Sequence, residues 1–149
     1  MKIAFKLDMI PSTLTAQGAG KRLGIRGKHA VFFKTAEFDA LEAEYVMRCK
    51  PHRPNPPLAG PVALWIDFVF PWRAGESRAV RALGRVPKTT KPDGGNMSKA
   101  LEDCLTKAGF WIDDAQVADL RVTKAWGDAV GVYVSIETIE QPELQLSLL

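Results

Sequence analysis

The sequence predicts one α+β domain, in which helices pack on one face of a small mixed β-sheet. Segments with alternating apolar and polar residues predict four or five strands, and two segments with apolar residues at helical spacing predict two helices. These segments do not follow a repeated strand-helix-strand order, which favours α+β over a doubly wound fold. The 149 residues are enough for a sizeable core, so we treat residues 1–149 as a single domain.

The first half of the chain begins with a predicted strand over residues 2–10 and a polar, glycine-rich segment over residues 11–28. A short strand is predicted over residues 30–33. An amphipathic helix is predicted to follow, with Thr35 as its N-cap and its apolar residues at helical spacing. Those apolar residues are Phe38, Leu41, Tyr45 and Val46. Four prolines between residues 51 and 57 then predict an extended connector.

The second half begins with a strong strand candidate over residues 61–71. Residues 73–92 contain few large apolar side chains and several arginines, so we expect a mobile basic loop that orders on a ligand. A second helix is predicted with Asn96 as its N-cap and Gly109 just beyond its end. Residues 117–126 and 130–139 both alternate, and we expect these two strands to form a hairpin.

Composition bounds the setting of the protein. Cys49 and Cys104 are too few and too unpatterned for a disulfide framework or a zinc site, which indicates a reducing, cytoplasmic environment. The longest apolar run, residues 62–71, is too short to span a bilayer and contains Asp67. We therefore expect neither a membrane span nor a signal peptide.

Basic residues gather in two segments, although the net charge of the chain is only +3. Residues 72–99 contain Arg73, Arg78, Arg81, Arg85, Lys88, Lys91 and Lys99, with Glu76 and Asp93 as the only acids. The second cluster is Lys21, Arg22, Arg26, Lys28 and Lys34. Such segments attract a phosphate backbone in a salt-dependent way, whereas the alternative is that they are solvated loops. Arginines of this kind would contact phosphates and not bases.

Acids and a lysine surround the second predicted helix. Asp93 follows Pro92 at the entrance of this helix, where the free amides and the macrodipole favour negative charge. Lys99 lies one turn inside the helix. Asp113 and Asp114 follow it, after an aromatic pair that would anchor the turn. If the helix packs flat, carboxylates from its two ends can converge on a divalent ion.

Hard oxygen ligands without a nearby histidine or thiol pair suit Mg²⁺, with Mn²⁺ as an alternative, better than zinc. An ion of this kind beside a lysine, set among basic loops, is typical of phosphodiester hydrolysis. The residues alone leave simpler alternatives open. Residues 93–96 also make an ordinary turn, Asp113 and Asp114 could form a solvated turn, and Lys99 could pair with Asp103.

The segment KPDGGNMSKALEDCLTKAGFWIDDAQVADLRV, residues 91–122, resembles the core signature of the RusA family of Holliday junction resolvases, found in phages and prophages. That signature has Asp-x-Asp-Asn-x-x-Lys at the start of a helix and Asp-Asp-x-Gln after it. The resemblance extends more loosely to the N-terminal strand, the basic loop and the first helix. It implies a homodimer that binds four-way DNA junctions and makes paired nicks with Mg²⁺.

The family's functional residues carry over position by position. Asp93 matches the first acid, Lys99 the essential lysine and Asp114 the acid of the second motif. These three are the candidate catalytic residues, and Asp93, Asp113 and Asp114 are the candidate metal ligands. The candidate DNA-binding residues are Arg73, Arg78, Arg81, Arg85, Lys88, Lys91 and Asn96. Gln116 matches the last residue of the second motif.

Gly95 stands where the family has its second aspartate, and the loss of a charged oxygen should weaken metal binding. The chain could be an inactivated variant, a naturally degenerate junction binder, or an active enzyme in which Asp113 or water fills the vacancy. We therefore weigh a Mg²⁺-dependent junction endonuclease, impaired by Gly95, against a non-catalytic junction-binding protein of the same fold. A small RNA-binding or phosphate-binding module is a third alternative, disfavoured by the joint presence of Lys99 and Asp114.

Overall fold

The computed structural model describes residues 1–17 and 21–142. Its centre is a five-stranded sheet in the order β1-β7-β4-β6-β5, in which β4 and β6 are parallel and the other neighbours antiparallel. The strands are β1 (Lys2–Leu7), β4 (Val62–Phe70), β5 (Arg85–Pro87), β6 (Val117–Gly127) and β7 (Gly131–Thr138). The predicted α+β class and mixed sheet are confirmed.

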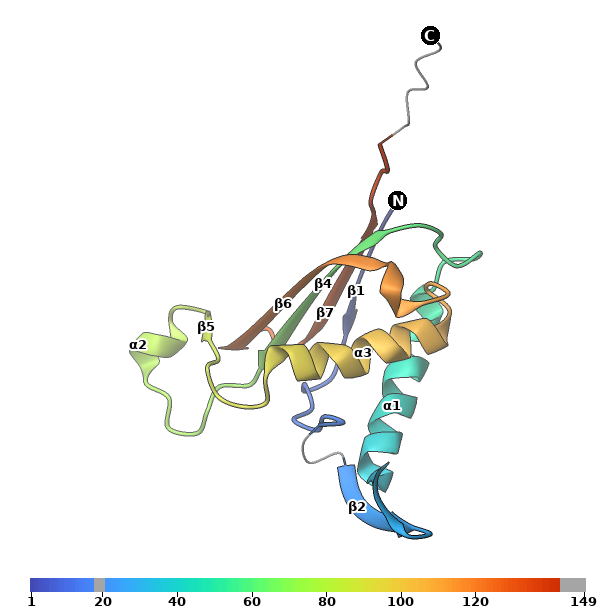
Figure 1. Cartoon of the computed structure of the whole chain (residues 1–149). Helices are drawn as coiled ribbons and strands as arrows, with labels where there is room; N and C mark the ends of the chain where they lie inside the picture. The colour runs from blue at the N-terminus through green and yellow to red at the C-terminus, as the bar shows by residue number, and fades with distance from the viewer. Residues whose placement is uncertain (18–20, 143–149) are drawn as a thin grey trace.

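Two helices, α1 (Ala36–Cys49) and α3 (Gly94–Ala108), lie against the same face of this sheet (Figure 1). The core between them contains Phe38 from α1, Phe68 from β4 and Leu101 from α3, each at most 1% exposed. Burial of each such side chain contributes roughly 1.5–3 kcal/mol. The Thr35 hydroxyl accepts a hydrogen bond from the Phe38 amide, as predicted for an N-cap, and Gly109 ends α3 at φ 94°.

The hairpin predicted between residues 117–126 and 130–139 is wrong. β6 and β7 do not pair, because β4 lies between them and is parallel to β6 and antiparallel to β7. β4 is buried along most of its length, so the central position covers its apolar side chains best. Alternation in a sequence fixes which side chains share a face, and it does not fix the neighbouring strand.

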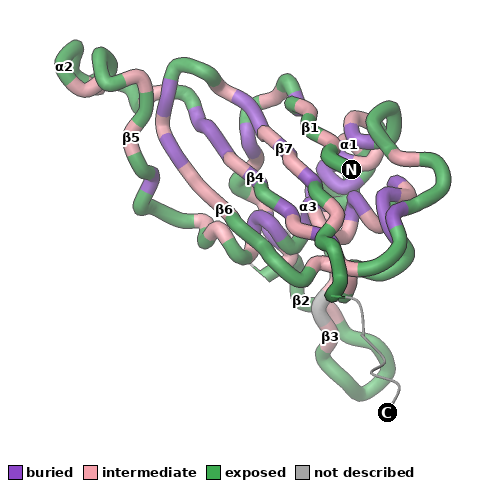
Figure 2. The backbone as a smooth tube through the Cα atoms, turned by 90° about the horizontal axis from the view of Figure 1, so that it is seen from above, coloured by how far each residue is buried: buried purple, intermediate pink, exposed green. Residues whose placement is uncertain are grey.

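Two segments predicted to lack strands or helices contain short elements. The basic segment 73–92 includes α2 (Arg78–Arg81), capped by the Ser77 hydroxyl, and β5, which pairs with β6. The glycine-rich segment includes β2 (Lys21–Arg26), which pairs with β3 (His29–Lys34) in a separate hairpin. This β2–β3 hairpin extends beyond the N-terminal end of α1 (Figure 1). The hairpin and the segment with α2 and β5 are both largely exposed (Figure 2).

Two 3₁₀ turns, η1 (Lys50–His52) and η2 (Asp114–Gln116), complete the described elements. None of the helices in the described part of the chain has both the length and the apolar character that a membrane-spanning helix needs.

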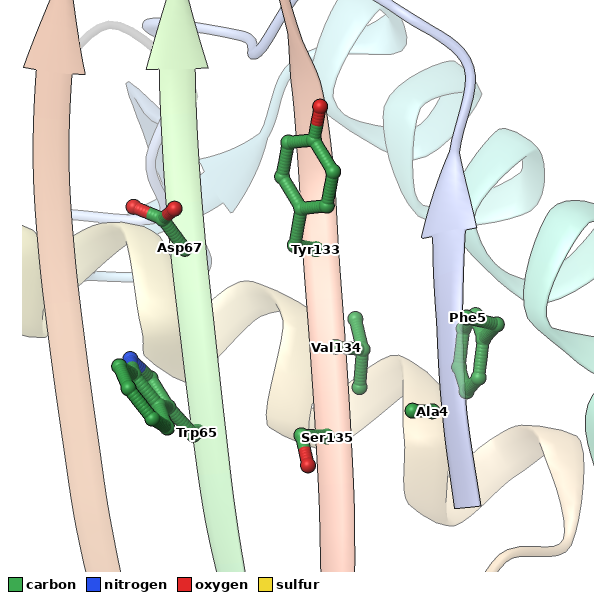
Figure 3. Close-up of a pocket in the computed structure, with 7 residues that line it drawn as sticks. All are labelled: Ala4, Phe5, Trp65, Asp67, Tyr133, Val134 and Ser135. Atoms are coloured by element: carbon green, nitrogen blue, oxygen red, sulfur yellow. The ribbon is translucent and has the colours of Figure 1, made fainter. Parts of the chain in front are cut away.

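The face of the sheet opposite α1 and α3 carries a shallow hollow of about 420 Å³ (Figure 3). Trp65, Asp67 and Tyr133 line it, with both helices behind the strands. The Asp67 carboxylate is already occupied, since it accepts two hydrogen bonds from Arg85, at 2.8 and 2.9 Å, and one from Thr123. These bonds outweigh the effect of burial and hold the Asp67 pKa below its usual value. The hollow is separate from the acids of α3, because it lies on the opposite face of the sheet.

Candidate functional site

Asp93 is the residue immediately before α3, with extended backbone angles. Its carboxylate is exposed and forms no capping hydrogen bond within the described residues. The first turn of α3 also lacks an acidic residue. The amides at this helix entrance are therefore not satisfied by an N-cap side chain, and an anionic or metal-bound group could approach beside Asp93.

Two lysines hold the segment that leads into Asp93. Lys124 of β6 donates to the backbone oxygens of Thr90 and Pro92, both at 2.8 Å. Lys88 donates to the backbone oxygens of Thr90 and Lys91, at 3.3 and 3.0 Å, and to the Thr90 hydroxyl. Because β6 and the end of β5 both fix this segment, the position of Asp93 depends on the sheet as well as on α3.

Lys88 was predicted from its charge to bind DNA, but its side chain is buried. It is only 5% exposed, and its ammonium group lies 5.0 Å from the centre of the Phe70 ring and 4.5 Å from that of Trp126. Burial, followed by the nearby charges of Lys124 and Arg73, lowers the Lys88 pKa. A side chain held in this way supports the backbone and is poorly placed to meet a phosphate.

One side of α3 carries the exposed residues Gly95 and Lys99 and the partly buried Glu102, spaced so that they share one stripe. A Cβ atom added to Gly95 would meet no described atom within 4 Å. The Glu102 pKa is raised by burial and by the charges of Asp114 and Asp103, although Ser98 and Lys99 oppose this rise. Position 95 thus has free space on the same stripe as Lys99 and Glu102, and the pKa of Glu102 is raised in part by the charge of Asp114.

Asp113 and Asp114 lie in a well-fixed turn after α3. Trp111 is 1% exposed and donates from its indole nitrogen to the Thr106 hydroxyl at 2.8 Å, which anchors the start of the turn. The Asp113 carboxylate accepts from the Ala115 amide at 2.9 Å. Gln116 accepts from the amides of Ile112 and Asp113.

The amide nitrogen of Gln116 also donates to the backbone oxygens of Leu58 and Gly60, both at 2.9 Å. One side chain therefore ties the acidic turn to the loop before β4. This explains why a glutamine suits the position, since an amide alone offers both a donor and an acceptor there.

The Asp114 pKa is raised, first by a hydrogen bond with the Asp113 carboxyl group, then by burial and the negative charge of Asp103. Mutual repulsion between adjacent carboxylates of this kind would be relieved by a proton or by a cation. The Asp113–Asp114 pair is therefore the part of the site with the clearest electrostatic demand for positive charge.

The acids at the two ends of α3 do not form a ready-made metal site. Within residues 1–17 and 21–142, no group of three or more His, Cys, Asp or Glu side chains is arranged to hold an ion. Asp103, which acts on Asp114, lies ten positions after Asp93, about 15 Å along the helix at about 1.5 Å per residue. The carboxylates suit a hard cation in their chemistry. In the described residues, however, the acids at the two ends of α3 do not converge on a common position for one ion.

Comparison with known proteins identifies the family. The family model described as Endodeoxyribonuclease RusA matches residues 16–137, which covers most of the chain and includes α3 and the acidic turn. This chain belongs to the RusA family. The resemblance found in the sequence of α3 is thereby confirmed.

Individual relatives match shorter stretches. Crossover junction endodeoxyribonuclease RusA of Escherichia coli (strain K12) is 51% identical over 45 residues, which cover 30% of this chain and 38% of the relative. The protein of the same name from Enterobacteria phage 82 gives the same values. Uncharacterized protein YqaN of Bacillus subtilis (strain 168) is 31% identical over 93 residues, 59% of this chain and 65% of the relative. The matched stretch thus spans less than two fifths of the length of the named RusA proteins.

The other basic residues of this RusA-family chain differ in how far they are engaged. Arg73 pairs with Glu76 at 3.2 Å, Arg81 donates to the Glu76 backbone oxygen, and Arg85 pairs with Asp67. Arg78 and Lys91 are exposed, and their side chains make no hydrogen bond or ion pair with a described residue. These last two are the most available for a phosphate.

Residues missed by sequence reasoning lie at the entrance of α3. Thr13, Thr15 and Gln17 line a polar hollow of about 310 Å³ together with Lys91, Pro92, Asp93 and Asn96. Residues 13–17 therefore form one wall of the hollow beside the candidate site. No motif in residues 11–17 marked them, because hydroxyl and amide residues in a glycine-rich stretch are equally typical of a solvated loop.

Proposed function

We propose that this chain binds four-way DNA junctions and acts as a structure-selective endodeoxyribonuclease whose cleavage is weakened by Gly95. Membership of the RusA family supports the nuclease class. The arrangement around α3 supports the location of the site, because Asp93, Lys99 and the Asp113–Asp114 turn all belong to this helix or its ends.

The observation that carries the proposal is the open position at Gly95. It lies in the first turn of α3, after Asp93 and one turn before Lys99, and a Cβ atom there has free space. A carboxylate at this position would add an acid to the first turn of α3, which has none. The chain thus keeps the frame of a metal-dependent nuclease and lacks one ligand.

We infer the following roles. Asp93 at the entrance of α3, and Asp113 and Asp114 beyond its far end, would offer carboxylates to Mg²⁺, or Mn²⁺, whose chemistry is to activate water and to neutralise phosphate charge. About 15 Å of helix separates the two positions, so they are proposed as separate contributions and not as the shell of one ion. Lys99 would stabilise negative charge that develops on the phosphate or the leaving oxygen. Asn96 would orient the DNA strand at the entrance of α3, because the Asn96 side chain lines the same hollow as Asp93. Catalysis is assigned to Asp93, Lys99 and Asp114.

Binding to DNA would depend on the exposed basic residues, above all Arg78 and Lys91, with Arg73, Arg81 and Arg85 in secondary roles. Paired cuts on opposite strands need two active sites, so we propose a homodimer. A nuclease acting on recombination intermediates would work in the cytoplasm of a bacterium, encoded by the host or by a phage.

The test compares the wild-type chain with Gly95→Asp on a labelled four-way junction over a Mg²⁺ titration. We expect Gly95→Asp to cleave at least tenfold faster and to reach half-maximal rate at a lower Mg²⁺ concentration, because a ligand is restored. Asp93→Asn and Asp114→Asn, each placed in the Gly95→Asp chain, should abolish the gain. Equal rates for the wild type and Gly95→Asp would show that this acid does not limit cleavage.

A non-catalytic junction-binding protein is the second candidate, and the absence of a three-acid cluster among the described residues favours it. Gel shifts in the absence of Mg²⁺, followed by addition of the ion, separate the two functions. Binding followed by symmetric nicks supports the nuclease, whereas tight binding without nicks at any Mg²⁺ or Mn²⁺ concentration supports the second candidate. A chain without junction preference would contradict both.

A further inference from the structure

The β2–β3 hairpin is a strongly basic arm that the proposed active site does not use. Residues 21–34 contain no Asp or Glu. Their positively charged residues are Lys21, Arg22, Arg26, Lys28 and Lys34. The hairpin extends away from the five-stranded sheet, beyond the end of α1 (Figures 1 and 2). A projecting arm of one charge sign is suited to a partner of the opposite sign.

The same arm exposes large apolar side chains. Leu23 is 64% exposed and Ile25 is 81% exposed. They are two residues apart in β2, so both point to one side of the hairpin, and Arg22 and Arg26 point to the other. Two neighbouring aliphatic side chains on an otherwise charged arm leave apolar surface in water, which is a mark of an interaction site.

The hairpin is fixed in shape and tied to the body of the protein. Gly27 makes the turn at φ 63°, and the Phe33 ring covers Gly24 so closely that an added Cβ atom would clash with it at 2.5 Å. The Arg22 guanidinium stacks on this ring, 5.2 Å from its centre. The exposed side of β2 is therefore presented by two paired strands whose opposite side is covered by the Phe33 ring.

At the base of the hairpin, Lys34 pairs with the nearly buried carboxylate of Glu42 on α1 at 2.7 Å. Glu42 also pairs with Lys107 of α3 at 2.9 Å. Burial acts against the ionised form of Glu42, but the bonds from Lys34 and Lys107 outweigh it and lower the pKa. One carboxylate thus links the arm to the helix that carries the candidate active site.

We propose that the β2–β3 hairpin recognises the branch point of junction DNA, with Arg26 and Lys28 near its turn on phosphates and Leu23 and Ile25 against base pairs exposed at the crossover. This inference rests on the proposed function. A two-stranded ribbon fits a DNA groove, and apolar side chains can enter between base pairs at the cost of unstacking them. That cost is lowest where a branch already interrupts the stack.

Charge decides for DNA over a second copy of the chain. Two hairpins meeting through Leu23 and Ile25 would bring two arms without acids together, and their positive charges would repel. A polyanion with exposed apolar base surfaces satisfies both the charge and the apolar side of the arm.

The test uses the double variant Leu23→Ser/Ile25→Ser, because both side chains are exposed and their loss should leave the fold intact. Met47→Ser is the matched control, since Met47 is 63% exposed on α1 away from the hairpin. Dissociation constants are measured for a four-way junction and for a linear duplex of the same arm length. Fluorescence of 2-aminopurine at the branch point reports on stacking there.

We expect the double variant to lose about tenfold in affinity for the junction and little for the duplex, with a smaller fluorescence change, while Met47→Ser behaves as the wild type. Arg26→Ala/Lys28→Ala should weaken binding to both DNAs and reduce the salt dependence.

An unchanged preference of the double variant for the junction would overturn the hairpin assignment while leaving the proposed function intact. A change in oligomeric state by analytical ultracentrifugation, without a change in junction preference, would also overturn it and assign the apolar side to a protein contact. A wild-type chain that does not distinguish junction from duplex would contradict the proposed function itself, and the inference with it.

Discussion

The ammonium groups of Lys88 and Lys124 donate hydrogen bonds to the same acceptor, the backbone oxygen of Thr90, at 3.3 and 2.8 Å. Two positive charges approach each other there because the carbonyl oxygens of the segment before Asp93 need donors that the backbone cannot supply. Lys88 is buried over two aromatic rings, whereas Lys124 reaches the segment from β6. The sheet and the entrance of α3 are therefore joined through side chains.

Lys124→Met should lower the free energy of unfolding by about 1–3 kcal/mol, because two carbonyl oxygens lose a charged donor. The start of α3 should also loosen, with faster hydrogen exchange at the Met97 amide, which bonds to the Asp93 backbone oxygen. Chemical denaturation and exchange measurements check both effects. Lys91→Met is the control, since it removes the same charge from an exposed side chain nearby, and a similar loss in both variants would contradict the assigned role of Lys124.

The ion pair between Asp67 and Arg85 should make stability depend on acid pH. The Asp67 pKa is lowered in the folded protein, so its contribution is complete above the ordinary value of 3.8 and disappears as pH falls through the folded value. Asp67→Asn should cost about 1–2 kcal/mol at pH 7, a modest amount because Arg85 is half exposed. Thermal unfolding of both proteins from pH 7 to pH 2.5 should show this difference shrinking below pH 3.8, and a constant difference would refute the link.

The sequence was sufficient to predict that α3 and β4 exist, because their apolar residues repeat with the period of a helix and of a strand. The predicted N-cap of α3, Asn96, was wrong, since the helix begins at Gly94 after Asp93. It could not place β4 between β6 and β7, since pairing depends on how three strands compete for the centre of the sheet. The contacts that the Lys88 and Gln116 side chains make inside the protein could not be predicted either. A lysine is usually exposed, and nothing local to Gln116 indicates that its partners include Leu58 and Gly60, almost sixty residues earlier.

Gln116→Glu should destabilise the acidic turn in a pH-dependent way. A carboxylate has no donor for the backbone oxygens of Leu58 and Gly60, so we expect a loss of about 2–3 kcal/mol at pH 7. The new acid would have a raised pKa, and its protonation on lowering the pH should recover part of this loss. Urea denaturation at pH 7 and pH 4.5 measures the recovery. Gln141→Glu, at an exposed position, should show neither effect.

Gly95→Asp should leave the fold intact or stabilise it, apart from any effect on cleavage. Replacement of a helical glycine is favourable where the new side chain has room, and a negative charge in the first turn interacts well with the helix dipole. Together these effects should raise stability by about 0.5–1.5 kcal/mol, and Gly95→Ala should give only the first part. Thermal unfolding without MgCl₂ measures these two effects, and a second measurement with about 10 mM MgCl₂, chosen to exceed the dissociation constants of weak carboxylate sites, tests for a bound ion. Mg²⁺ should raise the melting temperature of Gly95→Asp more than that of Gly95→Ala, and equal shifts would argue against an ion at this position.

Arg78 and Arg85 should respond differently to the same substitution, although both are arginines of the basic segment 73–92. Arg78→Ala should weaken binding to junction and duplex alike and reduce the salt slope by about one, because an exposed side chain without a described partner contributes one phosphate contact. Arg85→Ala should lower protein stability first, because it leaves the half-buried Asp67 carboxylate without its main partner. Binding titrations between 50 and 200 mM salt, a range of about fourfold chosen for its leverage on the slope, are combined with thermal unfolding. If Arg78→Ala reduced stability and left the salt slope unchanged, the division of this segment into DNA-facing and structural arginines would be wrong.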